Sequence, residues 1–153
     1  MVFESTLYPP LTRHFQKDYL MAWEVPLASK KIDVVCARPK DSYFASNQLA
    51  SGETNIPNTF QEIIAIEVKV EKWKKALRQA LIYQLCAHKV YVALWYSYLK
   101  NVDFDCFARF GVGVIAVDGN ARIVKESKQS PHVNPEYMSS IEKYFIEQKV
   151  RRG

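Results

Sequence analysis

Cysteine is scarce in this sequence, and its pattern excludes two common uses of the residue. The chain has three cysteines, Cys36, Cys86 and Cys106, and no Cys-x-x-Cys pair. An odd number without paired spacing argues against a disulfide framework and against a zinc site built from cysteines. We therefore expect free thiols, and we expect Cys36 to pack inside a strand.

Long apolar runs are also missing. The longest, residues 90–99, contains a serine and three tyrosines, and it is too short to cross a bilayer as a helix. The N-terminal segment is interrupted by Glu4, Pro9 and Pro10, so it does not follow a signal-peptide pattern. These features lead us to expect an intracellular, cytoplasmic protein that is not secreted and has no membrane partner.

Internal repeats, low-complexity tracts and clear linkers are absent too, so a single domain over residues 1–153 is the simplest organisation. Hydrophobic residues make up 48% of the chain and charged residues 24%. These values are typical of globular proteins and exclude wholesale disorder. The formal net charge of +5 favours an anionic partner, but only weakly, because many proteins are mildly basic.

The spacing of apolar residues predicts three helices. Residues 11–21 have roughly helical spacing and follow two prolines, which are tolerated in a first helical turn. Residues 71–88 have clear helical periodicity. A C-terminal helix over 134–148 is indicated by Asn134 as N-cap and Pro135 at the first helical position.

Strands are predicted between these helices, at residues 23–27, 31–37, 60–70, 90–96 and 111–117. Asp118-Gly119 predicts a hairpin turn into residues 121–124. The apolar run at residues 63–66 is typical of a central strand buried on both faces. Residues 38–59 are polar and contain prolines, which predicts a long inserted loop. The expected order, α-β-β-β-α-β-β-α, indicates an α/β fold with a mixed central sheet flanked by helices.

Three charged residues in the strand regions carry the chemical signal. Glu67 and Lys69 lie at the end of the expected central strand, and they point to the same face because side chains alternate along a strand. Asp33 lies inside the preceding strand between Ile32 and Val34. A charge there is costly unless it is paired or binds a metal. If the two strands pair, Asp33 and Glu67 can share one divalent cation.

Such a pair of carboxylates suits phosphodiester hydrolysis. Mg²⁺ and Mn²⁺ prefer hard oxygen ligands and keep several of their waters. A bound cation lowers the pKa of its water and neutralises charge on a phosphate. Lys69 would orient or deprotonate that water and stabilise the developing charge. On the next helix, Gln79 and Tyr83 are spaced i, i+4 and share a stripe with Lys72.

Asp33, Glu67-x-Lys69 on a strand, and Gln79-x-x-x-Tyr83 on the following helix resemble the PD-(D/E)xK nuclease superfamily. That superfamily includes restriction endonucleases, archaeal Holliday-junction resolvases and RecB-type nuclease domains. The likeness covers roughly residues 2–117. It implies a restriction-endonuclease-like αβββαβ core, followed here by a C-terminal hairpin and helix. The sequence departs from the family at Ile32, which stands where the naming motif has proline, and the insertion at 38–59 has no clear counterpart.

The resemblance also implies roles for individual residues. Asp33 and Glu67 would bind Mg²⁺ or Mn²⁺ together with the backbone carbonyl of Val68, and Lys69 would be catalytic. Gln79 and Tyr83 would support the site, and Glu4 would contact the metal, commonly through water. The implied activity is metal-dependent cleavage of DNA, with RNA not excluded. Small size favours a structure-selective enzyme acting on junctions or branched DNA as a homodimer.

Basic residues near these positions add a candidate nucleic-acid surface. Lys30 and Lys31 precede the Asp33 strand, and Lys72 and Lys75 lie at the start of the helix that follows Lys69. Lysines of this kind contact phosphates without reading sequence. The alternative is that they form an ordinary solvated face.

Other interpretations of the acidic residues stay open. A Glu-x-Lys triplet alone is weak, and the chain holds a second one, Glu126-Ser127-Lys128, in a polar stretch to which we assign no role. Asp33 and Glu67 would otherwise form a structural ion pair with Lys69, and Glu24 rivals Glu4 as the additional acid. Two alternative functions follow: a nucleic-acid-binding module on the same fold with little or no catalysis, and a protein-interaction subunit whose acidic cluster is structural.

Overall fold

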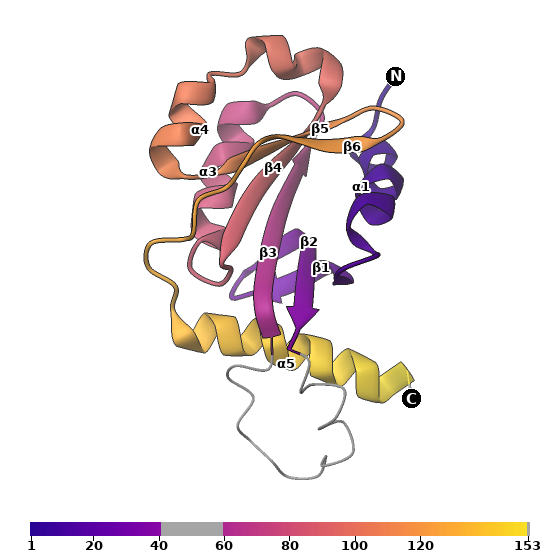
Figure 1. The fold of residues 1–153 in the computed structure, drawn as a ribbon, viewed down its shortest axis with the longest axis vertical. Helices are drawn as coiled ribbons and strands as arrows, with labels where there is room; N and C mark the ends of the chain where they lie inside the picture. The colour runs from indigo at the N-terminus through magenta and orange to yellow at the C-terminus, as the bar shows by residue number, and fades with distance from the viewer. Residues whose placement is uncertain (41–59, 153) are drawn as a thin grey trace.

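The computed structural model describes residues 1–40 and 60–152 and shows a mixed α/β fold (Figure 1). Its six strands form one sheet in the order β1-β2-β3-β4-β5-β6. The β1–β2, β2–β3 and β5–β6 pairs are antiparallel, whereas β3–β4 and β4–β5 are parallel. The strands are β1 (Leu20–Leu27), β2 (Lys30–Pro39), β3 (Phe60–Lys69), β4 (Lys89–Trp95), β5 (Gly113–Val117) and β6 (Ala121–Lys125).

Helices cover both faces of this sheet (Figure 1). The 3-10 helix η1 (Glu4–Leu7) and α1 (Tyr8–Phe15) pack on one face, where Leu7, Leu11 and Phe15 meet Ile66 and Val68. The other face carries a second apolar cluster shared with three further α-helices of the described residues. These are α3 (Trp73–Tyr83), α4 (Phe104–Phe110) and α5 (Pro135–Arg152), and the 3-10 helix η2 (Tyr96–Asn101) follows β4.

The predicted central strand is confirmed, because β3 contributes buried side chains to both clusters. Burying each aliphatic side chain contributes about 1.5–3 kcal/mol, so this strand anchors the sheet. Helix α3 connects β3 to its parallel neighbour β4, as parallel pairing requires a crossover. Lys69 consequently lies opposite Leu94 in register, and the ends of β3 and β4 share one edge of the sheet.

The first predicted helix was wrong in its bounds. The helix runs over Tyr8–Phe15 rather than residues 11–21, with both prolines inside its first turn. Leu20 and Met21, which had helical spacing, belong to β1 and pair with Ala37 and Cys36. Pairing with β2 therefore overrides the local helical pattern, and β1 begins three residues before the predicted strand.

Helix α4 was not predicted, so the expected element order holds only from α1 to β4. The Asp103 carboxylate caps it by accepting hydrogen bonds from the N–H groups of Asp105 and Cys106 at 3.0 and 3.4 Å. Gly111 ends it with a φ of 74°, a conformation that glycine adopts without strain. Both end signals are present in the sequence, eight residues apart.

Three further bounds need correction. The helix predicted over residues 71–88 is shorter and runs over Trp73–Tyr83. Arg38 and Pro39 belong to β2, so the predicted loop at 38–59 starts too early, and residues 41–59 lie outside the described residues. The C-terminal helix continues past 148 to Arg152, since that segment contains no helix breaker. Its predicted cap is confirmed, because Asn134 Oδ1 accepts hydrogen bonds from two N–H groups of the first turn at 2.9 and 3.2 Å. No helix of the described ranges is both long and apolar enough to cross a membrane.

Candidate active site

The candidate site lies where β2 and β3 stop pairing. The ladder between the two strands reaches Val34 opposite Ile66. One step beyond, the carboxylate of Asp33 accepts a hydrogen bond from the backbone N–H of Val68 at 2.8 Å. The Asp33 carboxylate, and not a backbone carbonyl, therefore accepts the β3 N–H that lies beyond the last backbone pair of the two strands. This bond holds Asp33 against β3 beside Glu67, and the expected pairing of the two strands is confirmed.

Glu67 is a charged residue in the core, with 4% of its surface exposed. Its Oε1 accepts a hydrogen bond of 2.6 Å from the hydroxyl of Tyr83, and its Oε2 lies 3.9 Å from Nζ of Lys69. Burial raises the pKa of Glu67 to about 7, and the nearby Asp33 carboxylate acts in the same direction. The Tyr83 hydrogen bond and the Lys69 charge lower the pKa and only partly offset burial.

Lys69 joins a third carboxylate to this pair. Its Nζ lies 3.8 Å from Oε1 of Glu4, a half-exposed residue of η1. Glu4 belongs to η1, which packs on the face of the sheet opposite to α3 and Tyr83. It reaches Lys69 at the end of β3, where η1 packs. Lys69 thus lies near two carboxylates, Glu4 and Glu67, and Asp33 lies beside Glu67, so the ionised site carries excess negative charge and attracts cations.

The two helix residues predicted to support the site are separated by the structure. Tyr83 is buried, and its hydroxyl reaches Glu67 and also lies 3.3 Å from the carbonyl of Lys31. Gln79, one turn earlier, accepts a hydrogen bond from Lys30 at 3.2 Å near the protein surface. The shared stripe is correct, but the contact with the acidic pair is made by Tyr83.

The four lysines of the candidate nucleic-acid surface are all exposed. Lys30 and Lys31 begin β2 just after the turn that follows β1, and the Gln79 contact places Lys30 beside α3. Lys72 is the N-cap residue of α3, and Lys75 lies in its first turn. The four lysines therefore lie on or next to β2 and α3, the two elements that also carry Asp33 and Tyr83.

Two further residues lie near the acidic pair: Glu24, which the sequence offered as a rival to Glu4, and Tyr8, which the sequence did not single out. Glu24 lies between the pairs Trp23–Val34 and Val25–Ile32, hence across from Asp33, and its φ of 52° interrupts the ladder. This conformation costs of order 1–3 kcal/mol in a non-glycine residue. Burial raises the pKa of Tyr8, and the charges of Asp33, Glu4, Glu24 and Glu67 add to the increase. No spacing pattern marks Tyr8, whose position depends on the packing of η1.

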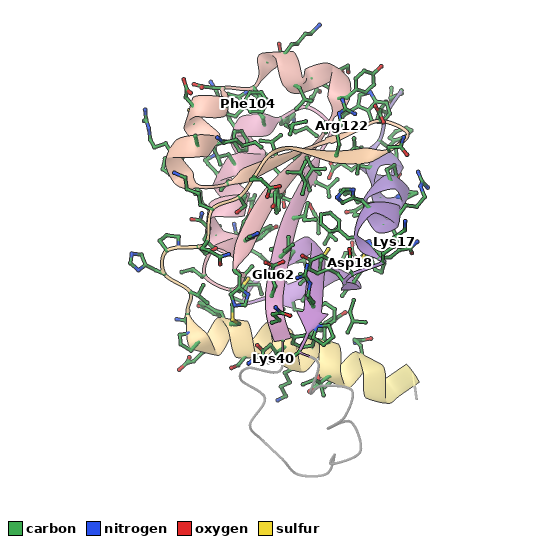
Figure 2. All side chains as sticks on the ribbon, in the orientation of Figure 1. Lys17, Asp18, Lys40, Glu62, Phe104 and Arg122 are labelled. Carbon is green, nitrogen blue, oxygen red and sulfur yellow. The ribbon has the colours of Figure 1, made fainter. Side chains whose placement is uncertain are left out.

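A second polar cluster surrounds Glu62 on β3, a residue labelled in Figure 2, and its charges are balanced differently. Glu62 accepts a hydrogen bond from Tyr19 at 2.5 Å and lies 4.0 Å from Arg38 and 3.7 Å from Lys89. Two cations and a hydroxyl thus satisfy a single carboxylate. This cluster has no excess negative charge and serves to link β2, β3 and β4.

The residues able to hold a metal at the candidate site are Asp33 and Glu67. Throughout residues 1–40 and 60–152, no group of three or more His, Cys, Asp or Glu side chains is arranged to hold a metal ion. Two carboxylates are nevertheless a sufficient side-chain set for Mg²⁺, which keeps waters and takes substrate phosphates as further ligands. Burial and, to a smaller extent, the Asp33 charge raise the pKa of Glu67, and a bound divalent cation would favour the ionised carboxylates against both.

Comparison with known proteins finds a similar fold but gives no information about the chemistry of the site. No protein-family model matches the sequence, and no curated protein matches it. A solved structure is similar, described as the SPO1766 protein of unknown function from Silicibacter pomeroyi. The likeness has a TM-score of 0.68 and 17% identity and covers 99% of this chain and 89% of that one. Two chains this different in sequence share the mixed α/β architecture, and their common fold carries no statement about activity.

Proposed function

We propose that this protein is a metal-dependent nuclease of the PD-(D/E)xK class that hydrolyses DNA phosphodiester bonds. One observation carries the proposal: pairing of β2 with β3 places Asp33 beside Glu67, with Lys69 3.9 Å from Glu67. The element order from α1 to β4 supports a restriction-endonuclease-like αβββαβ core, because it is the order that the resemblance implies.

Asp33 and Glu67 would hold Mg²⁺ or Mn²⁺, and Glu4 would contact the ion through water. The N–H of Val68 faces Asp33, and the N–H and C=O of one strand residue point toward the same neighbouring strand. The Val68 carbonyl is therefore directed toward the same opening and would serve as a further ligand. When bound, the ion would supply Lewis-acid polarisation of the phosphate and a water of lowered pKa.

The chain's own residues then divide the remaining work. Lys69 presents an ammonium group that orients the attacking water and stabilises negative charge developing on the phosphate. Tyr83 fixes Glu67 through a 2.6 Å hydrogen bond to Oε1 and leaves Oε2 turned toward Lys69. The Val68 N–H holds Asp33 in the same way. Lys30, Lys31, Lys72 and Lys75 would contact the phosphate backbone on either side of the cut.

The proposal extends to branched DNA as substrate and to a homodimer as the active form. A four-way junction presents two equivalent strands, and a two-fold symmetric dimer places two identical sites on them. The four lysines supply contacts that are independent of sequence, which suits recognition of DNA shape.

A cleavage assay tests this function directly. Labelled linear, flapped and four-way-junction DNA, with a single-stranded RNA for comparison, would be incubated with wild type and with Asp33→Ala in Mg²⁺ and in Mn²⁺. We expect metal-dependent cutting of DNA that is lost in Asp33→Ala. Hydrolysis would be overturned if the wild-type protein cut no DNA in either metal. If it still bound DNA as tightly as Asp33→Ala does, the alternative of a nucleic-acid-binding module would remain. Cutting of RNA alone would correct the substrate class.

A further inference from the structure

A pocket of about 500 Å³ opens next to the candidate active site. One wall is formed by Val70 and Glu71, which directly follow Lys69. Residues 1 and 2, which precede the segment carrying Glu4, form another part. The remainder comes from Trp95 at the end of β4 and from Ser97 and Tyr98 in η2. Two of the three chain segments that line the pocket thus lead directly into site residues.

The position of this pocket in the sheet favours a ligand site. Lys69 and Trp95 are the last residues of β3 and β4, which pair in parallel. Ligands of open α/β sheets bind outside the carboxyl ends of parallel strands. The volume lies within the roughly 300–1,000 Å³ of small-molecule sites. A group bound here would lie at the same sheet edge as the ammonium of Lys69.

The lining residues define what kind of group fits. Trp95 and Tyr98 offer aromatic faces, Glu71 a carboxylate and Ser97 a hydroxyl. Among the described residues that line this pocket, none is a lysine or an arginine, so no basic side chain is available there to bind a phosphate. Aromatic faces stack on the flat face of a nucleobase. A carboxylate accepts hydrogen bonds from an exocyclic amino group, such as that of cytosine.

We infer that this pocket receives one unpaired nucleobase next to the phosphate that is cut, an inference that rests on the proposed nuclease function. The base stacks on Tyr98 or Trp95, and its edge faces Glu71 and Ser97. A base inside an intact duplex has both faces covered, and its exposure requires unstacking and unpairing. The substrate class is therefore nucleic acid with an unpaired nucleotide at the cut, as in flaps, junctions and single strands.

Binding without divalent cations tests the pocket apart from cleavage. The probes are two oligonucleotides carrying 2-aminopurine, one unpaired in a single-stranded flap and one paired in a duplex. Stacking on an aromatic side chain quenches this fluorophore. We expect Tyr98→Ala to weaken binding of the flap roughly 5- to 150-fold, the range for loss of one stacked base, while duplex binding stays unchanged. Trp95→Phe keeps a ring in place and should retain most of the quenching.

Tyr137→Ala is the matched control. Tyr137 is an exposed tyrosine of α5, outside the pocket. It should leave both affinities at the wild-type value, and thermal melting verifies that every variant is folded. Equal losses on flap and duplex in Tyr98→Ala, or no loss on either, would overturn the base pocket.

Cleavage of the same two probes in Mg²⁺ separates the two proposals. If wild type cuts both probes equally and Tyr98→Ala does the same, the base pocket fails and the nuclease stands. If nothing is cut but Tyr98→Ala selectively loses the flap, hydrolysis fails and the base pocket stands.

Discussion

The chain contains two Glu-x-Lys triplets that are alike in sequence and partly alike in their contacts. In Glu67-Val68-Lys69, the glutamate accepts a hydrogen bond from buried Tyr83 at 2.6 Å. In Glu126-Ser127-Lys128, it accepts one from buried Tyr91 at 2.9 Å. The spacing of the motif and a tyrosine partner therefore do not distinguish a candidate site from an ordinary surface segment.

The charged residues of the two triplets have different surroundings. Glu67 is buried in the central strand next to a second carboxylate, whereas Glu126 and Lys128 are exposed in an irregular segment after β6. The middle residue is buried in both triplets but makes different contacts. Val68 packs into the apolar core, while the buried hydroxyl of Ser127 accepts the N–H of Val90 and lies 3.1 Å from the carbonyl of Gly111. The first triplet places its charges beside a second carboxylate, whereas the second uses its buried middle residue as a hydrogen-bonded link.

The largest contrast should appear in catalysis. Lys69→Ala removes the ammonium group beside Glu67, and we expect the cleavage rate in Mg²⁺ to fall by about 10²–10⁴-fold, the range for a lost catalytic donor or acid–base group. Lys128→Ala should cut at the wild-type rate, since Lys128 is exposed and distant in sequence from the site. Single-turnover rates on the preferred DNA substrate measure both. Equal losses in the two variants would contradict the assignment of the first triplet.

The two glutamates should also differ in how they make the free energy of unfolding depend on pH, because the pKa of Glu67 is shifted. That pKa is raised from 4.5 to about 7, chiefly by burial. Between these values the folded carboxyl keeps its proton while the unfolded one has lost it, so the free energy of unfolding should fall as pH rises from 4.5 to 7. The decrease is at most about 3 kcal/mol, and it levels off above pH 7.

Glu67→Gln removes this decrease, and the difference between wild type and the variant isolates it. The subtraction is needed because burial lowers the pKa of His88, which gives a slope of opposite sign in wild type and variant alike. Urea unfolding at a series of pH values without metal gives the curves. Glu126→Gln is the control and should keep the wild-type slope. A slope that survives in Glu67→Gln would show that Glu67 is not the group responsible.

The parts of the site that could be predicted are those fixed by local periodicity. Alternation along a strand is enough to place Glu67 and Lys69 on one face and Val68 in the core, and the run before them identifies a central strand. The i, i+4 spacing similarly places Gln79 and Tyr83 on one stripe. This spacing does not specify which of the two contacts Glu67, because they lie about 6 Å apart along the helix axis. The packing of α3 against the sheet places Tyr83 there.

Long-range packing determines the rest and leaves little trace in the sequence. Tyr8 approaches the carboxylates because η1, which directly precedes it, packs against β3, and no spacing pattern in the sequence marks this packing. The register that sets Glu24 opposite Asp33 depends on β1 beginning at Leu20, within a stretch whose spacing indicates a helix. Helix α4 is a different case, since Asp103 and Gly111 are recognisable end signals that its short length conceals.

The two tyrosines give a third, smaller contrast. Tyr83→Phe removes the hydrogen bond that fixes Glu67 and should weaken Mn²⁺ binding roughly 10- to 100-fold, as is usual for residues that orient metal ligands. Tyr91→Phe breaks the equivalent bond to Glu126 and should leave Mn²⁺ affinity unchanged. The rise in melting temperature during a Mn²⁺ titration reports binding to the folded state. A similar loss of affinity in Tyr91→Phe would mean that the effect is a general one on the core.

The smallest contrast concerns the middle residue of the second triplet. Ser127→Ala leaves the N–H of Val90 and one acceptor bond of Gly111 without their partner, and a buried polar group without a partner costs about 1–3 kcal/mol. Ser127 is 8% exposed, so water can replace part of the loss, and we expect the lower half of that range. Urea unfolding measures the change, with Lys128→Ala as the exposed neighbour that should alter stability by less than about 0.5 kcal/mol. Because Ser127 links strand β4 to the end of α4 and not to the acidic pair, the destabilised variant should still cut DNA at the wild-type rate while it is folded. A rate that falls together with stability would show that the two triplets are coupled and that the second is more than a structural link.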